Sequence, residues 1–400
     1  MFFDKGGRHH YFAKYLGDAG YDVTIICAST VHNSNANALI DEAEIFSESV
    51  SDSVKYVFIR TRAYGDSGFK RALNMLDYYR GLKKTIVSFE KPDVIIGSSV
   101  HPLACVSAIQ LSHEFECKNI VEIRDLWPEA IVSFGSMSNK NPITNGLYAL
   151  EKWIYARADS LIFTMEGGAQ YIRDKRWDTQ HGGPVSLDKV HSINNGIDIE
   201  FFDHNRAENE FQHEALDNNA KLKVVYAGSI RKLNNVKFIV EAAECLKSER
   251  DVDFLLFGEG PYLPELKEYR DRNNLENVKF FGQVEKKFIP SILSKADITL
   301  MNYQVAPVWK YGGSQNKQFD YFAAGKPVCS NLDNPYSLIE RYECGIEHSF
   351  SSPQELADSI IHLLRNPEKC HALGASARKA ALAYDFKTSL TPQLISVIEE

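Results

Sequence analysis

The chain has 400 residues, a formal net charge of −8, and 44% hydrophobic and 24% charged residues. This length predicts two domains of ordinary globular composition, and the acidic balance argues against nucleic acid as a partner. No apolar run reaches the ~20 residues that a membrane-spanning helix needs, and the opening MFFDKGG is too polar for a secretion signal. The seven cysteines show no CxxC spacing, which predicts buried thiols in a reducing cytoplasm rather than disulfides or zinc.

Short apolar runs alternate with longer helical patterns, which indicates βα units and parallel sheets. The polar stretch 203–222 separates two series of runs and is the expected domain junction. We therefore expect an N-terminal domain at 1–200, a C-terminal domain at 201–380, and a helix at 381–400 that packs back toward the N-terminal domain. The expected strands lie at 22–28, 56–60, 94–98, 119–123, 160–164, 189–193, 223–227, 253–257, 278–281, 298–302 and 327–330.

A glycine pair opens the first expected helix, His9–Ala19. Gly6 and Gly7, followed by Arg8, would let backbone N–H groups approach a phosphate at the helix start. A parallel fold requires a strand before such a turn, but only the apolar triplet MFF precedes it. We therefore expect that the first strand of the N-terminal domain is missing.

Residues 70–84 combine five Lys or Arg with a single Asp and with leucines, a methionine and tyrosines. The simplest interpretation is a solvated surface helix. The alternative is a face that makes peripheral contact with anionic lipid, through charge attraction and apolar insertion.

Parallel α/β domains bind ligands where their strands end, so polar groups at these positions are candidate site residues. His101 follows the strand that ends at Ser98 and could hydrogen-bond a sugar or a phosphate; it could equally be structural. Asp125 follows another strand and could orient or deprotonate an acceptor hydroxyl. The competing interpretation is an ion pair between Arg124 and Asp125 at a helix start, with Trp127 in the core.

Two loops of the C-terminal series resemble phosphate loops. Gly228 permits a close turn after a strand, and Arg231 with Lys232 would stabilise a diphosphate leaving group, unless they form a solvated basic turn. Gly258 and Gly260 flank Glu259 and could admit phosphates or a base, although a plain turn is as good an explanation. The metal-binding pattern Asp251-Val252-Asp253 enters a strand instead of leaving one, so it is discounted.

The stretch 311–328 combines a glycine pair, a helix start and a helix stop. Ser314 is the expected N-cap, and Gly325 with Pro327 ends the helix. Asn316 and Asp320 lie at i and i+4 and therefore share one face near the N-terminus, where an anion is favoured.

These motifs together make the chain resemble the GT-B glycosyltransferases of family 4, which are retaining enzymes that use nucleotide sugars. The LWPE and NKxFDYxAAGKP variants resemble the subgroup that builds bacterial surface polysaccharides, including amino-deoxy-sugar transferases. The matching segments, in chain order, are GGRHHYFAKYLGDAGYDVTII, SSVHP, IRDLWPE, NNGID, YAGSIRK, FGEGP, NVKFFGQV and NKQFDYFAAGKPV.

The resemblance implies an α/β fold of two Rossmann-like, doubly wound parallel-sheet domains facing a cleft. It implies a cytoplasmic, metal-independent hexosyltransferase without a cofactor, peripheral on the inner face of the cytoplasmic membrane if residues 70–84 contact lipid. The donor would be a UDP-linked sugar, and the acceptor a glycan or a polyprenyl-linked glycan in surface polysaccharide synthesis. A nucleotide-sugar epimerase of similar fold and a non-catalytic nucleotide-sugar-binding protein remain alternatives.

The resemblance also implies roles for residues. Asp125 or His101 would touch the acceptor or the transferred sugar, and Arg231 with Lys232 would neutralise the leaving diphosphate. The backbone around Val284 would meet the base, and Asp320 the ribose. Gly312, Gly313 and Asn316 would face the sugar and phosphates. The full expected binding set is Gly6, Gly7, Arg8, Gly228, Gly258, Gly260, Val284, Gly312, Gly313, Asn316, Lys317 and Asp320.

The chain departs from the family pattern at three places. Of the usual two glutamates spaced eight apart, the second is Asp320 and the first position holds Gly312. The usual Arg and Lys of the phosphate loop fall on Ser229 and Asn234, so Arg231 and Lys232 are the expected substitutes. The histidine that is common after the fifth strand is replaced by Asp125 or its neighbour.

Overall fold

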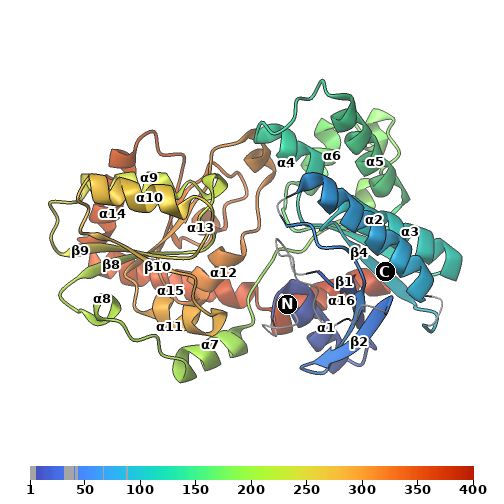
Figure 1. The fold of residues 1–400 in the computed structure, drawn as a ribbon, viewed down its shortest axis with the longest axis horizontal. Helices are drawn as coiled ribbons and strands as arrows, with labels where there is room; N and C mark the ends of the chain where they lie inside the picture. The colour runs from blue at the N-terminus through green and yellow to red at the C-terminus, as the bar shows by residue number, and fades with distance from the viewer. Residues whose placement is uncertain (1–5, 31–39, 41–43, 66, 87–88) are drawn as a thin grey trace. The chain divides into compact units, whose positions relative to one another are not determined.

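The computed structural model describes residues 6–30, 40, 44–65, 67–86 and 89–400. Two compact units form: unit 1 holds residues 1–194 and 390–400, and unit 2 holds residues 195–389. The chain passes from unit 1 to unit 2 at Asn194–Asn195, earlier than the junction expected at 203–222. That stretch lies inside unit 2, where the helix α7 (Ile199–Glu208) packs on α11 (Ile289–Ser294) (Figure 1).

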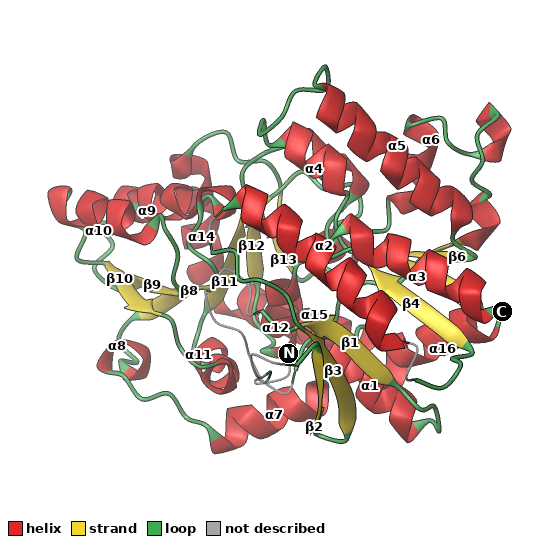
Figure 2. Cartoon of the chain, turned by 45° about the vertical axis from the view of Figure 1, so that its right-hand side comes forward, coloured by secondary structure: helices red, strands yellow, loops and turns green. Residues whose placement is uncertain are grey.

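The described part of unit 1 contains two β-sheets. The first has the order β1-β3-β2, with β1 (Thr24–Ala28) parallel to β3 (Val54–Ile59) and β2 (Phe46–Ser51) antiparallel to it. The second is parallel throughout, and its order follows the chain: β4 (Val94–Ser98), β5 (Lys118–Ile123), β6 (Ser160–Phe163) and β7 (Val190–Ser192). Figure 2 shows the strands of both sheets in yellow, with α2 and α3 beside them.

Side-chain alternation along β3 divides the core around the first sheet into two layers. Tyr56 and Phe58 pack with Ala13 of α1, whereas Val57 and Ile59 pack with Tyr78 of α2. Successive residues of a strand point to opposite faces, so one apolar strand supplies both layers. The helices of unit 1 are α1 (Arg8–Asp18), α2 (Gly68–Thr85), α3 (Pro102–Phe115), α4 (Trp127–Ser133), α5 (Pro142–Arg157), α6 (Gly168–Asp174) and α16 (Thr391–Glu399).

The last helix of the chain, α16, belongs to unit 1. Lys118 at the start of β5 donates a hydrogen bond from Nζ to the carbonyl of Val397, with a separation of 2.6 Å. This bond satisfies one of the carbonyls that every helix end leaves without an internal partner. Among the described residues, no helix is long and apolar enough to cross a membrane.

Unit 2 is built on one six-stranded parallel sheet of order β10-β9-β8-β11-β12-β13. Figures 1 and 2 both show α9, α10 and α14 on one face and α11, α12 and α15 on the other. Its strands are β8 (Leu222–Ala227), β9 (Val252–Phe257), β10 (Val278–Gly282), β11 (Ile298–Asn302), β12 (Val328–Asn331) and β13 (Gly345–Glu347). Besides α7 and α11, its helices are α8 (Glu214–Asp217), α9 (Val236–Cys245), α10 (Leu263–Arg272), α12 (Asn316–Ala323), α13 (Leu338–Arg341), α14 (Pro353–Leu364) and α15 (Pro367–Ala383).

All eleven expected strands are present, with ends that differ by at most two residues. Two strands were missed, β2 and β13. The sequence of β2, FSESVS, is mostly polar, and it pairs antiparallel with β3 across a turn in which Asp52 and Ser53 have positive φ. β13 has only three residues. The strand expected to be missing before Gly6 falls outside the described residues and stays a prediction.

Candidate functional site

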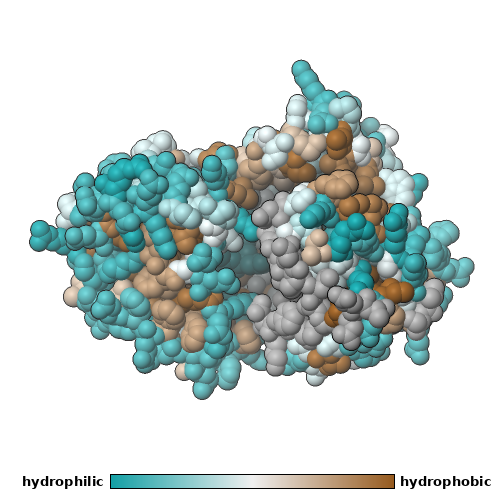
Figure 3. All heavy atoms as spheres, in the orientation of Figure 1, coloured by the Kyte–Doolittle hydropathy of each residue, from teal (hydrophilic) through white to brown (hydrophobic). Residues whose placement is uncertain are grey.

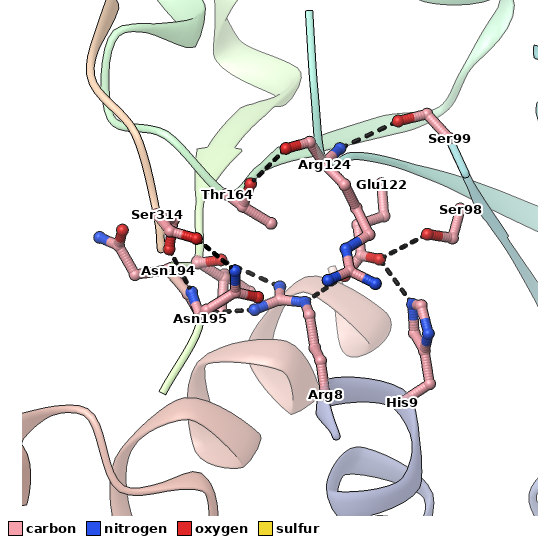
Figure 4. Close-up of polar contacts among 11 residues, drawn as sticks. Arg8, His9, Ser98, Ser99, Glu122, Arg124, Thr164, Asn194, Asn195 and Ser314 are labelled. Atoms are coloured by element: carbon pink, nitrogen blue, oxygen red, sulfur yellow. Dashed lines mark hydrogen bonds and ion pairs between the residues drawn. The ribbon is translucent and has the colours of Figure 1, made fainter. Parts of the chain in front are cut away.

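A buried carboxylate, Glu122, organises the carboxyl edge of the second sheet of unit 1 (Figure 4). Arg8 Nε lies 2.6 Å from Glu122 Oε1, and His9 Nε2 lies 2.7 Å from Oε2. Ser98 Oγ donates to the same Oε2 at 2.8 Å. Burial alone would raise the pKa of Glu122, but the charges of Arg8 and His9 hold it well below its usual value. The carboxylate is therefore ionised, and both of its oxygens are hydrogen-bonded within the fold.

Arg8 belongs to this internal network. Besides Glu122, its guanidinium donates to the carbonyls of Ile193 at 2.9 Å and of Asn194 at 2.5 Å. The side chain is 5% exposed, and burial lowers its pKa from the usual arginine value. Arg8 thus forms a structural tie between α1 and the chain after β7, and its expected contact with a donor stays a prediction. Gly7 has φ 102° at the start of α1, and Gly6 is buried beside it.

Asp125 lies at the entrance to α4 and lines a small cavity inside unit 1. The cavity has a volume of about 30 Å³, which is room for about one water molecule. Its walls include Trp127, Pro128 and a second carboxyl, Glu151. Desolvation raises the pKa of Asp125, although the charge of Arg124 opposes the shift. Burial likewise raises the pKa of Glu151, to about 7, against hydrogen bonds from Tyr171 and Tyr155.

His101 is the N-cap of α3. Its Nδ1 accepts a hydrogen bond from the backbone N–H of Ala104 at 3.2 Å, and its ring packs edge-on against Tyr78. Burial, aided by the charge of Arg71, lowers the pKa of His101 to about 4. Because a backbone N–H can only donate, the neutral ring carries its proton on Nε2. The structure thus gives His101 a helix-capping role and leaves Nε2 as a donor.

The glycines at the strand ends of unit 2 are required by close packing between neighbouring loops. A Cβ on Gly258 would lie 1.9 Å from the carbonyl oxygen of Gly228, and one on Gly260 would lie 2.2 Å from that of Ile230. Gly258 also has φ 139°, which other residues rarely adopt. The loops after β8 and β9 are tied by the hydrogen bond from Ile230 N to Glu259 O, of 2.9 Å.

The two cations expected to hold the diphosphate, Arg231 and Lys232, are both exposed. Lys232 Nζ lies 5.7 Å from the centre of the Tyr262 ring. Val284, expected near the base, follows β10 and is half-buried. These residues come from the loops after β8 and β10, at the edge of the sheet where ligands bind in parallel folds.

The helix α12 begins at Asn316, and the expected cap is wrong. Its N-cap is Gln315, and within the described part of the chain no side chain caps it. Ser314 is engaged elsewhere: its Oγ accepts from Asn195 N at 2.7 Å, and its carbonyl accepts from Asn195 Nδ2 at 2.6 Å. Asn316 is exposed at the first helical position.

The glycine pair before α12 is held in a tight turn. Gly312 has φ 85°, and a Cβ there would lie 3.3 Å from Cδ2 of Tyr336. A Cβ on Gly313 would meet Gln315 Nε2 at 2.3 Å. Tyr336 therefore stands beside the position where the family places its first glutamate.

Two charged groups of α12 lie at the carboxyl edge of the unit 2 sheet. Lys317 Nζ is 2.9 Å from the hydroxyl of Tyr226, and it lies 2.7 Å from where a Cβ on Gly228 would be. Burial lowers the pKa of Lys317 to about 7. Asp320 follows one turn later, and burial raises its pKa to about 6 despite the charge of Lys286. Both groups are held in an environment that disfavours their charge.

Three residues escaped the sequence reasoning: Glu122 at the sheet edge of unit 1, and Tyr226 and Tyr303, whose rings lie beside Lys317 in unit 2. Glu122 had a usable signal, because a lone acid in the apolar run NIVEI must find a cation when it is buried. Tyr226 and Tyr303 had none, since tyrosines near strand ends are ordinary core residues. Among the described residues, no group of three or more His, Cys, Asp or Glu is arranged to hold a metal ion.

Two family models match adjoining parts of the chain. The model described as Glycosyltransferase Family 4 matches residues 9–201, and the model described as Glycosyl transferases group 1 matches residues 221–366. The first falls mainly on unit 1 and the second on unit 2.

Curated relatives match over part of their length. Alpha-D-kanosaminyltransferase of Streptomyces kanamyceticus is 25% identical over 180 residues, which are 44% of this chain and 45% of the relative. The putative teichuronic acid biosynthesis glycosyltransferase TuaH of Bacillus subtilis is 27% identical over 156 residues, 39% of this chain and 38% of the relative. The chain thus spans less than half of the length of these two relatives.

Solved structures share the fold over nearly the whole chain. Sucrose-phosphate synthase from Thermosynechococcus elongatus superposes with a TM-score of 0.72 at 17% identity, covering 99% of this chain and 94% of that one. HepE from Anabaena, solved in complex with UDP-glucose, gives a TM-score of 0.64 at 18% identity, covering 87% and 86%. A glycosyltransferase model thus matches each half of the chain, and the chain shares the GT-B fold with these structures.

Proposed function

We propose that the protein is a retaining glycosyltransferase that moves a hexosyl group from a UDP-linked sugar to a glycan or polyprenyl-linked acceptor in surface polysaccharide synthesis. The observation that carries the proposal is the edge of unit 2, where Lys317, Asp320 and the uncapped start of α12 lie together. A cation beside a helix N-terminus suits a diphosphate. A desolvated carboxyl suits the hydroxyls of a ribose.

The nature of the donor and of the pathway is supported by relatives. HepE was solved with UDP-glucose, which favours uracil as the base. TuaH is named for teichuronic acid, a polymer, and the kanosaminyltransferase is named for transfer of an amino sugar. These names agree with a surface-polysaccharide subgroup that includes amino-deoxy-sugar transferases.

The chemistry of the proposed transfer balances without a further reactant. The acceptor oxygen forms a bond to the anomeric carbon, and the bond from that carbon to the phosphate oxygen breaks. Attack occurs on the face from which the diphosphate departs, so the configuration is retained. The departing phosphate oxygen takes the acceptor proton, while cations and helix N–H groups stabilise its charge. Asp125, or His101 through its Nε2–H, would orient the acceptor in unit 1.

The decisive experiment combines donors, acceptor and product analysis. The protein is incubated with UDP-, GDP- and ADP-sugars with and without a polyprenyl-linked glycan, and products are followed by mass spectrometry and NMR. We expect a new glycoside, of the same anomeric configuration as the donor, only when acceptor is present. Conversion of donor alone would indicate an epimerase, and binding without turnover a non-catalytic binder. Activity lost with EDTA and restored by Mn²⁺ would contradict the metal-independent mechanism.

We also propose that α2 brings unit 1 to the inner face of the cytoplasmic membrane. Phe69 is 75% and Leu76 37% exposed on this helix, and Lys70, Arg80 and Lys84 are exposed along it. Asp77, its one acid, is paired with Arg62 at 2.6 Å, so the exposed cations are not offset locally. On the face drawn in Figure 3, apolar and hydrophilic residues lie side by side over α2. This combination suits adsorption to anionic lipid.

Co-sedimentation with vesicles tests the membrane proposal. We expect binding to vesicles that contain phosphatidylglycerol, little binding to pure phosphatidylcholine, and weaker binding in high salt. The variant F69S/L76S should lose most of the binding. The control is L382S, which removes a leucine of intermediate exposure (52%) from α15 in unit 2. Equal binding of both variants would overturn the assignment of α2.

A further inference from the structure

Lys317 is held in an aromatic corner at the edge of the unit 2 sheet. Its Nζ lies 2.9 Å from the hydroxyl of Tyr226, 4.4 Å from the centre of the Tyr226 ring and 5.2 Å from that of Tyr303. The Tyr226 hydroxyl donates to the carbonyl of Ser229 at 2.7 Å and therefore accepts from the lysine. The amine is thus fixed against the loop that follows β8.

Lys317 is not held by an acid, unlike Lys295 and Lys279 of the same unit. Lys295 pairs with Glu210 and Asp217, and Lys279 pairs with Asp253. Across the described residues, Lys317 forms no ion pair, and its hydrogen-bond partner is the neutral phenol of Tyr226. Withdrawing a cation from water without an anion beside it is unfavourable, so the charged form of Lys317 is destabilised in the fold.

The surroundings of the amine indicate which kind of anion would stabilise its charge. Gly228 has no side chain, which lets the amine approach the loop closely: a Cβ on this residue would lie 2.7 Å from Nζ. Lys317 is also the second residue of α12, whose start has no side-chain cap within the described chain. A helix start, a glycine turn and a cation together suit a phosphate.

The exposed cations Arg231 and Lys232 are less suited than Lys317 to bind a phosphate strongly. A charge in bulk water is screened and interacts weakly, whereas the same charge at a desolvated edge interacts strongly. Lys317 is also linked through the Tyr226 hydroxyl to the carbonyl of Ser229, the position at which the chain lacks the arginine that was expected from its resemblance. A lysine from α12 therefore occupies the place that this loop leaves without a cation.

We propose that Lys317 is the residue that binds the diphosphate of the nucleotide donor, with Nζ donating to a phosphate oxygen beside Gly228. The proposal deepens the proposed function, because it takes a nucleoside diphosphate as the donor. Arg231 and Lys232 then contribute only longer-range attraction.

The proposal predicts that donor binding is coupled to proton uptake. An anion beside the amine raises its pKa, so binding takes up a proton wherever the free amine is partly neutral, and affinity falls as the pH rises above 7. The titratable groups that contact the amine are Tyr226 of β8 and Tyr303 after β11, whose pKa values burial raises. On its own helix lie Tyr321, whose pKa is also raised, and Asp320, which titrates near pH 6.

The test separates phosphate recognition from folding. UDP and uridine are titrated calorimetrically into the wild type, K317M, K317R, R231A/K232A and the control K237M, which removes an exposed lysine of α9. We expect K317M to weaken UDP roughly 10- to 100-fold, the range of a lost charged hydrogen bond, and to leave uridine unchanged. R231A/K232A should weaken UDP by less, and K237M should change nothing. K317R, which stays charged, should retain more UDP affinity than K317M.

A second measurement reads the proton directly. UDP-glucose, whose diphosphate does not titrate near neutrality, is bound at about pH 7.5 in two buffers of different ionisation enthalpy. We expect uptake of roughly three-quarters of a proton by the wild type and almost none by K317M.

The outcomes distinguish this inference from the proposed function. Wild-type UDP affinity in K317M, or an equal loss for UDP and uridine, would overturn the role of Lys317 and leave the proposed function standing. If the wild type binds none of UDP, GDP and ADP, the proposed function fails and the inference fails with it.

Discussion

Glu122 of unit 1 and Lys317 of unit 2 are both desolvated charges at the carboxyl edge of a parallel sheet, yet their surroundings differ. Glu122 is satisfied by Arg8, His9 and Ser98 within the fold. Lys317 is surrounded by the hydroxyl and ring of Tyr226 and by the ring of Tyr303. A buried charge whose partners are all internal holds a structure together, and one without a counter-charge is poised for a ligand. Position at a strand end therefore does not by itself make a residue functional.

The largest expected effect tests Glu122, whose charge is paired within the fold. Replacing Glu122 by Gln leaves the buried Arg8 without a counter-charge and should lower the free energy of unfolding by about 3–5 kcal/mol. Urea denaturation measures it. The control E114Q removes an exposed acid whose pair with Lys83 is long, 3.9 Å, and should change little. A loss below about 1 kcal/mol in E122Q would mean that the network does not stabilise unit 1.

The loop packing of unit 2 gives the next effect. Ala at Gly260 places a methyl group 2.2 Å from the carbonyl of Ile230 and should destabilise by about 3 kcal/mol, as overpacking typically does. Ala at Gly146 in α5 meets nothing within 4 Å and should stabilise by up to about 1 kcal/mol. If G260A is as stable as the wild type while donor affinity falls, this glycine serves the ligand rather than the packing.

The pH dependence of stability tests whether Asp320, one turn after Lys317, is desolvated. Its folded pKa of about 6 lies above its unfolded value, so the folded protein binds the proton more tightly and gains stability as the pH falls from about 7 to about 4. D320N removes this term. Relative to the wild type, the variant should be more stable by about 3 kcal/mol at pH 7, and the difference should fall below about 1 kcal/mol near pH 4. A difference that does not depend on pH would show that Asp320 is not desolvated.

His101 should give the smallest effect. H101A removes the cap of α3 and should cost about 1 kcal/mol, whereas H101S restores a capping oxygen. Because the pKa of His101 is about 4, its charge does not change between pH 5 and pH 8. If H101S regains stability and H101A loses no more activity than stability, the residue is a cap. Activity lost in H101S with stability intact would assign it to the acceptor.

Much of the fold could be predicted because each element carries its own pattern. The apolar run 298–302 coincides with β11, whose residues are all buried, since central parallel strands are apolar on both faces. β2 could not be predicted, because its polar sequence is held by pairing with β3. Ser314 had the chemistry of an N-cap but bonds to Asn195 instead, a choice that only long-range contacts decide.

The sequence by itself determined the βα alternation, the position of the glycine turns and the helix α12 that follows one of them. These follow from local periodicity and from residues that few backbones tolerate. The tertiary structure alone decided which charges are paired. Arg8 and Glu122 are 114 positions apart and meet, and Lys317 reaches Tyr226, 91 positions away, and finds no acid. The cost of burying a charge depends on what the folded chain places beside it, which no local pattern encodes.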